Sequence, residues 1–174
     1  IKVFAVSLFQ TFFTYLFTMK NKGKLSLERY TEEARQLCPI YTVIGLEAKS
    51  LIDNVYKCYT PLCDYTKNHL NIMHAGPIWM TAEYLGGLVV MHNCESSQFQ
   101  PVVANLEINF INPANSGIYG ELEFDEIAVK ALRQDLESCG QHKFETKVII
   151  RDEAEQIIAK AQGIYVVRNF LDAV

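Results

Sequence analysis

Apolar and polar residues alternate over much of the second half of the chain. Four segments, 102–110, 118–124, 144–150 and 157–167, have a period of two, which is typical of half-buried strands. Two shorter strands are predicted before them, one beginning at Tyr41 and one over 55–60, with a turn signal at Asp53-Asn54 between them. The segment 127–141 fits either a continued strand with a loop or a helical turn.

One apolar helix is predicted between the second and third of these strands, after a loop over 61–67. Proline is favoured at the first helical position because its missing N–H would have no partner there, so the helix is expected to begin near Gly76 or Pro77. The stretch from Ile78 to Met91 is apolar on most sides, which predicts that the helix is buried. The polar run 92–97 that follows is expected to be a loop.

Two further helices are predicted at the N-terminus. Residues 3–19 carry no charge, but five polar residues recur at helical spacing and form one stripe. This stripe favours a helix that packs on its own protein over a membrane span or a signal peptide, and contact with a membrane surface stays open. The second helix, 27–37, has Ser26 as a candidate N-cap and ends before Pro39.

These elements predict an α+β protein in which a curved antiparallel sheet wraps around one central helix, with two extra N-terminal helices. The chain has 174 residues, of which 49% are hydrophobic, and this is enough for one core. We therefore expect a single domain over 1–174, with an N-terminal helical extension at 1–38 and a core at 40–170.

Charge and cysteine content exclude some functions. The net charge is −4 and no basic run is present, which argues against nucleic acid as a partner. The five cysteines are odd in number and irregular in spacing, which indicates free thiols in a reducing, cytoplasmic environment. A zinc site is an alternative for some of them, but the gaps do not match the usual ligand pairs, so no metal is expected. Its candidate ligands are Cys58, Cys63, His69 and His74.

The central helix carries one carboxylate, Glu83, in otherwise apolar surroundings. A buried carboxylate is costly unless it is paired or used, and perturbed carboxylates gather at functional sites. Glu83 is therefore either satisfied by backbone N–H groups or functional. The Gly86-Gly87 pair costs helix stability, about 1 kcal/mol per glycine, and this suggests close approach of another backbone or of a ligand.

Two polar residues precede the helix at fixed distances from Glu83. Asn68 lies six residues before His74, and Glu83 lies nine residues after it. Nine residues make two and a half helical turns, so His74 and Glu83 do not share a helix face. If they cooperate, they do so from the end and the middle of the helix, or across two copies of the chain.

These residues carry a resemblance to a known family. Asn68, the His74-Ala75-Gly76 turn and Glu83, followed by Asn-Phe-Ile-Asn-Pro-Ala at 109–114, resemble the hotdog-fold acyl-CoA thioesterases of the PaaI-like type. The resemblance is to the bacterial branch with a His-Ala-Gly turn, and it covers about residues 40–170. It implies a hydrolase that cleaves an acyl-CoA or similar thioester without a cofactor. It also implies a homodimer, possibly assembled further into a tetramer, whose site is shared between subunits.

The resemblance assigns roles to individual residues. Glu83 would be the general base or nucleophile. The backbone N–H of Ala75, helped by Gly76, would stabilise the oxyanion at the positive end of the helix. Asn68 and His74 would orient the thioester or water. Pro77, Trp79, Gly86 and Gly87 are the candidates for substrate binding.

Other interpretations remain open. His74 also suits a plain helix cap, Asn68 a plain turn residue, and Trp79 a core position. The fold also suits a non-catalytic module that binds an acyl group or CoA, with Glu83 structural. A hotdog dehydratase or hydratase is disfavoured because the chain lacks a His-Phe-Pro turn. The basic residues that could contact CoA are scattered: Lys130, Arg133 and Lys143.

Overall fold

The computed structural model describes residues 25–94 and 98–169. In chain order the elements are α2 (Leu27–Leu37), α3 (Ile40–Val43), β1 (Glu47–Ile52), β2 (Val55–Thr60), α4 (Ala75–Asn93), β3 (Gln100–Phe110), β4 (Ile118–Glu123), α5 (Glu126–Cys139), β5 (Gln141–Asp152) and β6 (Ile157–Arg168). The helix predicted over 3–19 lies outside the described residues, and so does part of the loop predicted over 92–97.

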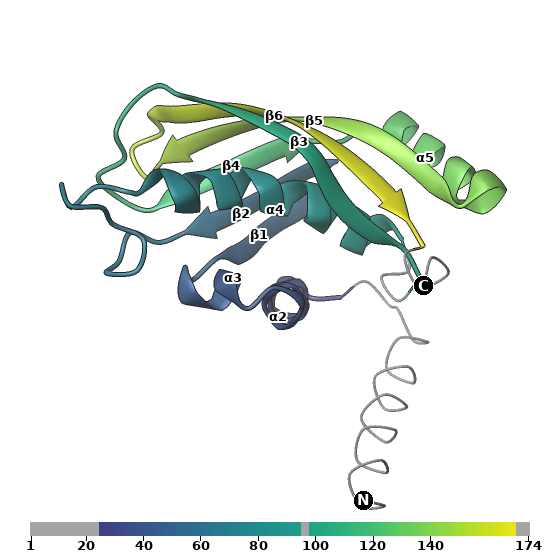
Figure 1. The fold of residues 1–174 in the computed structure, drawn as a ribbon, viewed down its shortest axis with the longest axis horizontal. Helices are drawn as coiled ribbons and strands as arrows, with labels where there is room; N and C mark the ends of the chain where they lie inside the picture. Colours follow the sequence, from purple (N-terminus) through teal and green to yellow (C-terminus); the bar gives the residue numbers. More distant parts are fainter. Residues whose placement is uncertain (1–24, 95–97, 170–174) are drawn as a thin grey trace, which may run out of the picture.

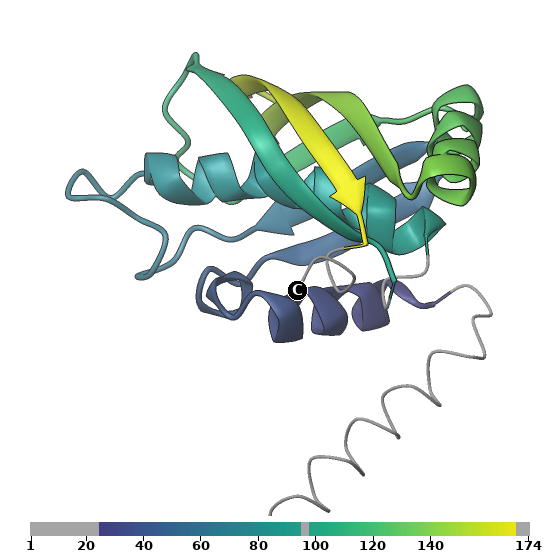
Figure 2. The same cartoon turned by 45° about the vertical axis from the view of Figure 1, so that its right-hand side comes forward.

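One six-stranded antiparallel sheet forms the body of the protein, with strand order β1-β2-β4-β5-β6-β3. The sheet curves around α4, while α2 and α3 lie beside β1 and α5 lies at the start of β5 (Figure 1, Figure 2). The α+β architecture predicted from the sequence is thereby confirmed.

The core lies between α4 and the concave face of the sheet. Leu88, Val89 and Val90 of α4 are fully buried. Alternate residues of β4 and β5 point at the helix and are buried, as the period of two predicts. The turn predicted at Asp53-Asn54 is also confirmed: both residues have positive φ, at 54° and 63°, as in a tight hairpin between two strands.

The prediction of a strand beginning at Tyr41 is wrong. Residues 40–43 form the short helix α3, and β1 begins only at Glu47. Tyr41 and Ile44 are buried three residues apart, which is the spacing of a helical turn rather than of a strand. Gly45, with φ of +67°, then turns the chain into β1.

The ambiguous segment 127–141 is a helix. The Asp125 side chain accepts a hydrogen bond from the Ala128 N–H at 2.8 Å and caps the start of α5. Gly140, with left-handed φ, ends it. The central helix α4 is longer than expected, since it begins at Ala75 and continues to Asn93.

The strand β3 is one edge of the sheet, and its alternation differs from the prediction. The pairing with β6 shifts between Val103 and Asn105, so a bulge transfers the remaining residues to the other face. Val102, which the sequence placed on the face of Leu106, is 47% exposed, while Phe110 stays in phase with Leu106 and is 52% exposed at the end of the strand. This edge therefore presents unpaired backbone groups and apolar side chains.

Candidate active site

Glu83 lies in the middle of α4 between two tyrosines from different parts of the chain. The Tyr41 hydroxyl, from α3, donates a hydrogen bond to the Oε2 atom of Glu83. The Tyr165 hydroxyl, from β6, donates to the backbone carbonyl of Glu83 at 2.8 Å. Neither tyrosine was a candidate from the sequence, because only the fold brings residues 42 and 82 positions away against Glu83.

Gly86 makes the second of these contacts possible. A Cβ atom at Gly86 would lie 2.2 Å from the Cζ atom of Tyr165, which is far below a van der Waals contact. The Tyr165 ring therefore crosses α4 in the space that a side chain would occupy. The same ring stacks on Phe144, with ring centroids 5.3 Å apart. The sequence predicted close approach of a backbone or a ligand at the glycine pair, whereas the group that approaches Gly86 is an aromatic side chain.

A cavity of about 220 Å³ lies next to Glu83. Its walls come from α2, α3, α4 and the start of β3, and its lining is mostly apolar. Gly87 faces it, and a Cβ atom at Gly87 would meet nothing within 4 Å. The lining residues are Ala34, Leu37, Cys38, Tyr41, Glu83, Tyr84, Gly87, Val90, Met91, Phe99, Gln100 and Pro101.

The surroundings of Glu83 favour a basic carboxylate. Burial raises its pKa above the ordinary value, and the hydrogen bond from Tyr41 opposes this rise. Burial and the Glu83 charge both raise the pKa of the Tyr41 phenol, so Tyr41 stays protonated and acts as the donor. Within residues 25–94 and 98–169, no Lys, Arg or His forms an ion pair with Glu83.

The start of α4 is built by the two polar residues that the sequence singled out. The exposed His74 is the N-cap, and its Nδ1 atom accepts a hydrogen bond from the Gly76 N–H at 2.9 Å. Asn68 shapes the preceding turn, since its Oδ1 atom accepts from the Leu70 N–H at 2.8 Å. These contacts show a cap and a turn; the catalytic roles of Asn68 and His74 stay predictions.

One backbone donor at the helix start is left over. In the described part of the chain, the N–H of Ala75 has no hydrogen-bond acceptor, while the N–H of Gly76 is taken by His74. Ala75 lines a second hollow, of about 280 Å³, together with Asn68 and the far end of β3. The other residues around this hollow are Met73, Ile78, Phe110, Ile111, Asn112, Pro113 and Ala114.

The two cavities lie at opposite ends of the edge strand β3. Gln100 and Pro101 border the Glu83 cavity, and Phe110 and Ile111 border the hollow at the helix start. Along α4, the eight residue steps from Ala75 to Glu83 rise by about 12 Å. Within one chain, the carboxylate and the free N–H are therefore too far apart to act on the same atom.

The remaining substrate-binding candidates lie elsewhere. Pro77 is buried and Trp79 half-buried, and neither lines one of these two cavities. Gly86 packs against Tyr165, so only Gly87 of the four candidates faces the Glu83 cavity. For all four, a role in substrate binding stays a prediction.

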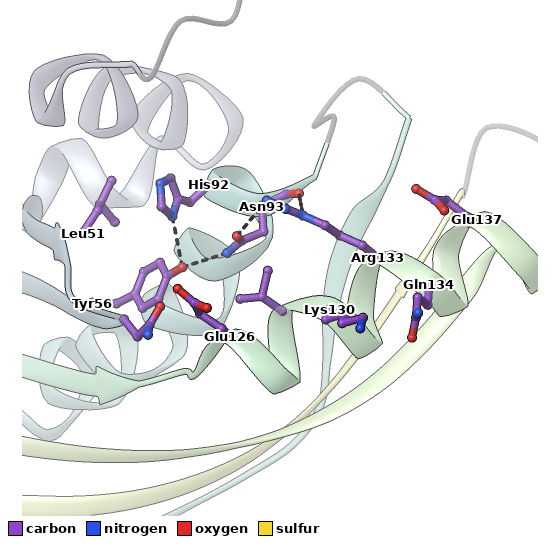
Figure 3. Close-up of a pocket in the computed structure, with 11 residues that line it drawn as sticks. Leu51, Tyr56, His92, Asn93, Glu126, Lys130, Arg133, Gln134 and Glu137 are labelled. Atoms are coloured by element: carbon purple, nitrogen blue, oxygen red, sulfur yellow. Dashed lines mark hydrogen bonds between the residues drawn. The ribbon is translucent and has the colours of Figure 1, made fainter.

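A third and larger hollow, of about 520 Å³, lies at the C-terminal end of α4, between the β1–β2 hairpin and α5 (Figure 3). Four of its polar residues bond to one another: Tyr56, His92, Asn93 and Arg133. The Tyr56 hydroxyl meets the Nδ1 atom of His92 at 3.0 Å and accepts from Asn93 at 2.7 Å (Figure 3). Arg133 donates to the Asn93 carbonyl at 3.2 Å. Lys130 and Arg133 both line this hollow, at the helix end opposite Ala75.

The alternative of a zinc site is not supported by the structure. Cys58 is buried, its thiol donates to the Thr81 carbonyl at 3.4 Å, and burial raises its pKa to about 12. In the part of the chain that the structure describes, no three or more His, Cys, Asp or Glu side chains gather as metal ligands. Among the same residues, no helix is both long enough and apolar enough to cross a membrane.

Comparison with known proteins agrees with this architecture. The model of a family described as a domain of unknown function, DUF4442, matches residues 29–167. No curated protein matches the chain. A Pseudomonas aeruginosa protein of unknown function, with a suggested thioesterase activity, has 22% sequence identity and a TM-score of 0.70, over 83% of this chain and 97% of that one.

Two other bacterial structures are similar. A Haemophilus influenzae thioesterase has 17% identity and a TM-score of 0.66, over 86% of this chain and 95% of that one. A Staphylococcus aureus thioesterase has 15% identity and a TM-score of 0.61, over 75% of this chain and 98% of that one. Its structures include a Gln→Ala and a Glu→Ala mutant, substituted 15 residues apart. At these identities the likeness establishes the fold, which is the hotdog fold.

Proposed function

The chain belongs to the DUF4442 family and has the hotdog fold, and we propose that it is a thioesterase that hydrolyses an acyl-CoA. The observation that carries this proposal is Glu83: a carboxylate with raised pKa and no ion pair among the described residues, beside an apolar cavity. The apolar walls suit an acyl chain, and the carboxylate suits attack on the thioester at its end.

The proposed reaction needs the carboxylate and one backbone donor. Glu83 removes a proton from water, which attacks the thioester carbonyl. In the alternative route the carboxylate itself attacks, and water then hydrolyses the mixed anhydride that forms on Glu83. The negative charge that forms on the carbonyl oxygen is stabilised by the Ala75 N–H at the positive end of α4. When the carbon–sulfur bond breaks, the thiolate leaves and takes up a proton, and the acid is released.

Because these two groups lie about 12 Å apart along one helix, the proposed site is shared by two chains. The edge strand β3 offers unpaired backbone groups and the exposed side chains of Val102, Phe110 and Ile111. If two copies pair antiparallel through β3, the Gln100 end of one strand lies beside the Phe110 end of the other. The Glu83 cavity of one chain would then meet the helix start of its partner.

The spacing of the candidate residues also supports the proposal. Asn68 and Glu83 are 15 residues apart, and the substituted Gln and Glu of the S. aureus thioesterase have the same separation. A Gln and a Glu with this spacing were thus chosen for substitution in a protein of similar fold, which supports Asn68 and Glu83 as a functional pair. In this proposal the Nδ2 group of Asn68 orients the water or the thioester, while its Oδ1 atom holds the turn.

The first test is thiol release from short, medium, long and aromatic acyl-CoAs. Glu83→Gln keeps the size of the side chain and removes the base, so we expect kcat to fall by about 10²- to 10⁴-fold. Glu123→Gln, at an exposed position of β4, is the matched control and should keep full activity. Full activity of Glu83→Gln would refute the catalytic role of Glu83. No release by the wild type on any substrate would place the non-catalytic acyl-binding module first.

A second test addresses the shared site. Ala75→Pro removes the backbone donor at a position where proline is tolerated, and His74 already has the extended backbone that precedes proline, with ψ of 148°. This variant should fold and lose about 10²- to 10³-fold in kcat. When Ala75→Pro and Glu83→Gln chains are mixed equally and refolded, half of the dimers hold one chain of each kind. Each mixed dimer has one site with both groups intact and one site with neither, so about a quarter of the wild-type activity should return. No recovery would contradict a shared site.

A further inference from the structure

Resting on the proposed thioesterase function, we propose that Tyr41 is the positioning residue for Glu83. Its hydroxyl holds the Oε2 atom, while the Oε1 atom of Glu83 has no hydrogen-bond partner among the described residues and is not fully buried. Tyr41 thereby fixes the side chain with one carboxylate oxygen occupied. The free Oε1 atom, beside the cavity, is the one that takes the proton from water or attacks the thioester.

The backbone around Tyr41 is itself held in place. The Tyr41 N–H donates to the Cys38 carbonyl at 3.0 Å, and the Tyr41 carbonyl accepts from the Leu46 N–H at 3.0 Å. The Tyr41 ring packs edge-on against Tyr84, with ring centroids 5.4 Å apart, and only 9% of the residue is exposed. The phenol is therefore delivered to Glu83 from an anchored turn and not from a mobile side chain.

The titratable groups around the carboxylate come from four elements. They are Cys38 at the end of α2, Tyr41 of α3, Tyr84 of α4 and Tyr165 of β6. Burial raises the pKa of Tyr84 and of Tyr165, so both phenols stay neutral at the pH at which Glu83 titrates. Of these groups, Tyr41 alone donates a hydrogen bond to the carboxylate, and this bond lowers the Glu83 pKa against the effect of burial.

Two functional consequences follow from this geometry. Tyr41 keeps Glu83 ionised to a lower pH than burial alone would allow. It also restricts a glutamate side chain that otherwise has three rotatable bonds, so that the Oε1 atom keeps one orientation. Loss of the phenol should affect the chemical step and its pH dependence, with little effect on the affinity for the acyl chain.

The test is the Tyr41→Phe variant, which keeps the ring and removes the hydroxyl. The lost bond has a charged acceptor, so we expect kcat to fall by about 10- to 100-fold with KM within about twofold. The acidic limb of the pH profile of kcat/KM should move up by about one pH unit. Tyr84→Phe is the matched control, because the Tyr84 hydroxyl has no hydrogen-bond partner among the residues that the structure describes. Its acidic limb should stay at the wild-type position.

A second measurement does not depend on activity. The pKa of Glu83 is followed by NMR titration of side-chain carboxyl carbons in ¹³C-glutamate-labelled protein, with Glu83→Gln to assign the signal. Tyr41→Phe should raise this pKa, and Tyr84→Phe should leave it unchanged. Thermal unfolding confirms that each variant is folded.

The outcomes separate the two proposals. If the wild type hydrolyses no acyl-CoA but the Glu83 pKa rises in Tyr41→Phe, the thioesterase function fails and the positioning of Glu83 by Tyr41 stands. If the wild type is active but neither the pH profile nor the NMR titration moves in Tyr41→Phe, the positioning role is overturned. An equal shift in Tyr84→Phe would overturn it as well, because the effect would then not require the hydrogen bond.

Discussion

Two adjacent glycines of the central helix should respond to the same substitution with opposite sign. A Cβ atom at Gly87 meets nothing within 4 Å, whereas a Cβ atom at Gly86 lies 2.2 Å from the Tyr165 ring. Both residues lie inside α4, so alanine improves the helix propensity of both by about 1 kcal/mol. The difference between the two variants therefore reports the contact with Tyr165 alone.

The magnitudes follow from that contact. Gly87→Ala should stabilise the protein by about 1 kcal/mol. In Gly86→Ala, displacement of the Tyr165 ring costs about 2 kcal/mol, and loss of its hydrogen bond to the Glu83 carbonyl costs about 1 kcal/mol. After the gain in propensity, Gly86→Ala should be destabilised by about 2 kcal/mol, which leaves about 3 kcal/mol between the two variants.

The assay is urea unfolding at pH 7, supported by thermal melts. For a chain of this size, 1 kcal/mol corresponds to about 2–4 °C in Tm, so the two variants should differ by about 6–12 °C. Gly86→Ala combined with Tyr165→Ala is the control, because removal of the ring should remove most of the penalty of the added methyl group. Equal stability of Gly86→Ala and Gly87→Ala would refute the close approach of Tyr165 to the helix.

The remaining predictions concern Glu83 and the helix caps. Burial raises the pKa of Glu83 above its ordinary 4.5, so the contribution of Glu83 to stability is complete below pH 4.5 and is lost as the pH rises through the folded-state pKa. In urea melts, Glu83→Gln should therefore gain stability relative to the wild type as the pH rises from 4.5 to 8. A difference that does not change with pH would contradict this. His74→Ala and Asp125→Ala each remove an N-cap acceptor and should each cost about 1 kcal/mol, measured as a fall of about 2–4 °C in Tm. If thiol release falls equally in both, His74 is only a cap; a greater loss in His74→Ala would indicate a role in the site.

Several elements followed from the sequence because their signals are local. The period of two in β4 and β5 depends only on which face of a strand meets the core, and the structure has both strands where they were predicted. Glu83 was a candidate because a carboxylate in an apolar helix is costly wherever the helix packs. The DUF4442 match and the hotdog fold agree with this local reading.

Other features depended on contacts between distant parts of the chain. Tyr41 was expected in a strand, and only the packing of α3 against α4 shows that its hydroxyl bonds to Glu83. Tyr165 fits the alternation of β6, but the bond from its hydroxyl to the Glu83 carbonyl requires β6 to pass beneath Gly86. The bulge in β3 could not be predicted either, because the alternation within one strand does not show which of its residues stays unpaired with the neighbouring strand.

Hydrophobic periodicity, helix caps and a misplaced charge are properties of neighbouring residues, and the sequence alone determined the helix and strands that carry the candidate carboxylate. The partners of that carboxylate were decided by the tertiary structure. They come from residues 42 and 82 positions away, and no local pattern encodes a hydrogen bond that forms only when the sheet has curved around the helix.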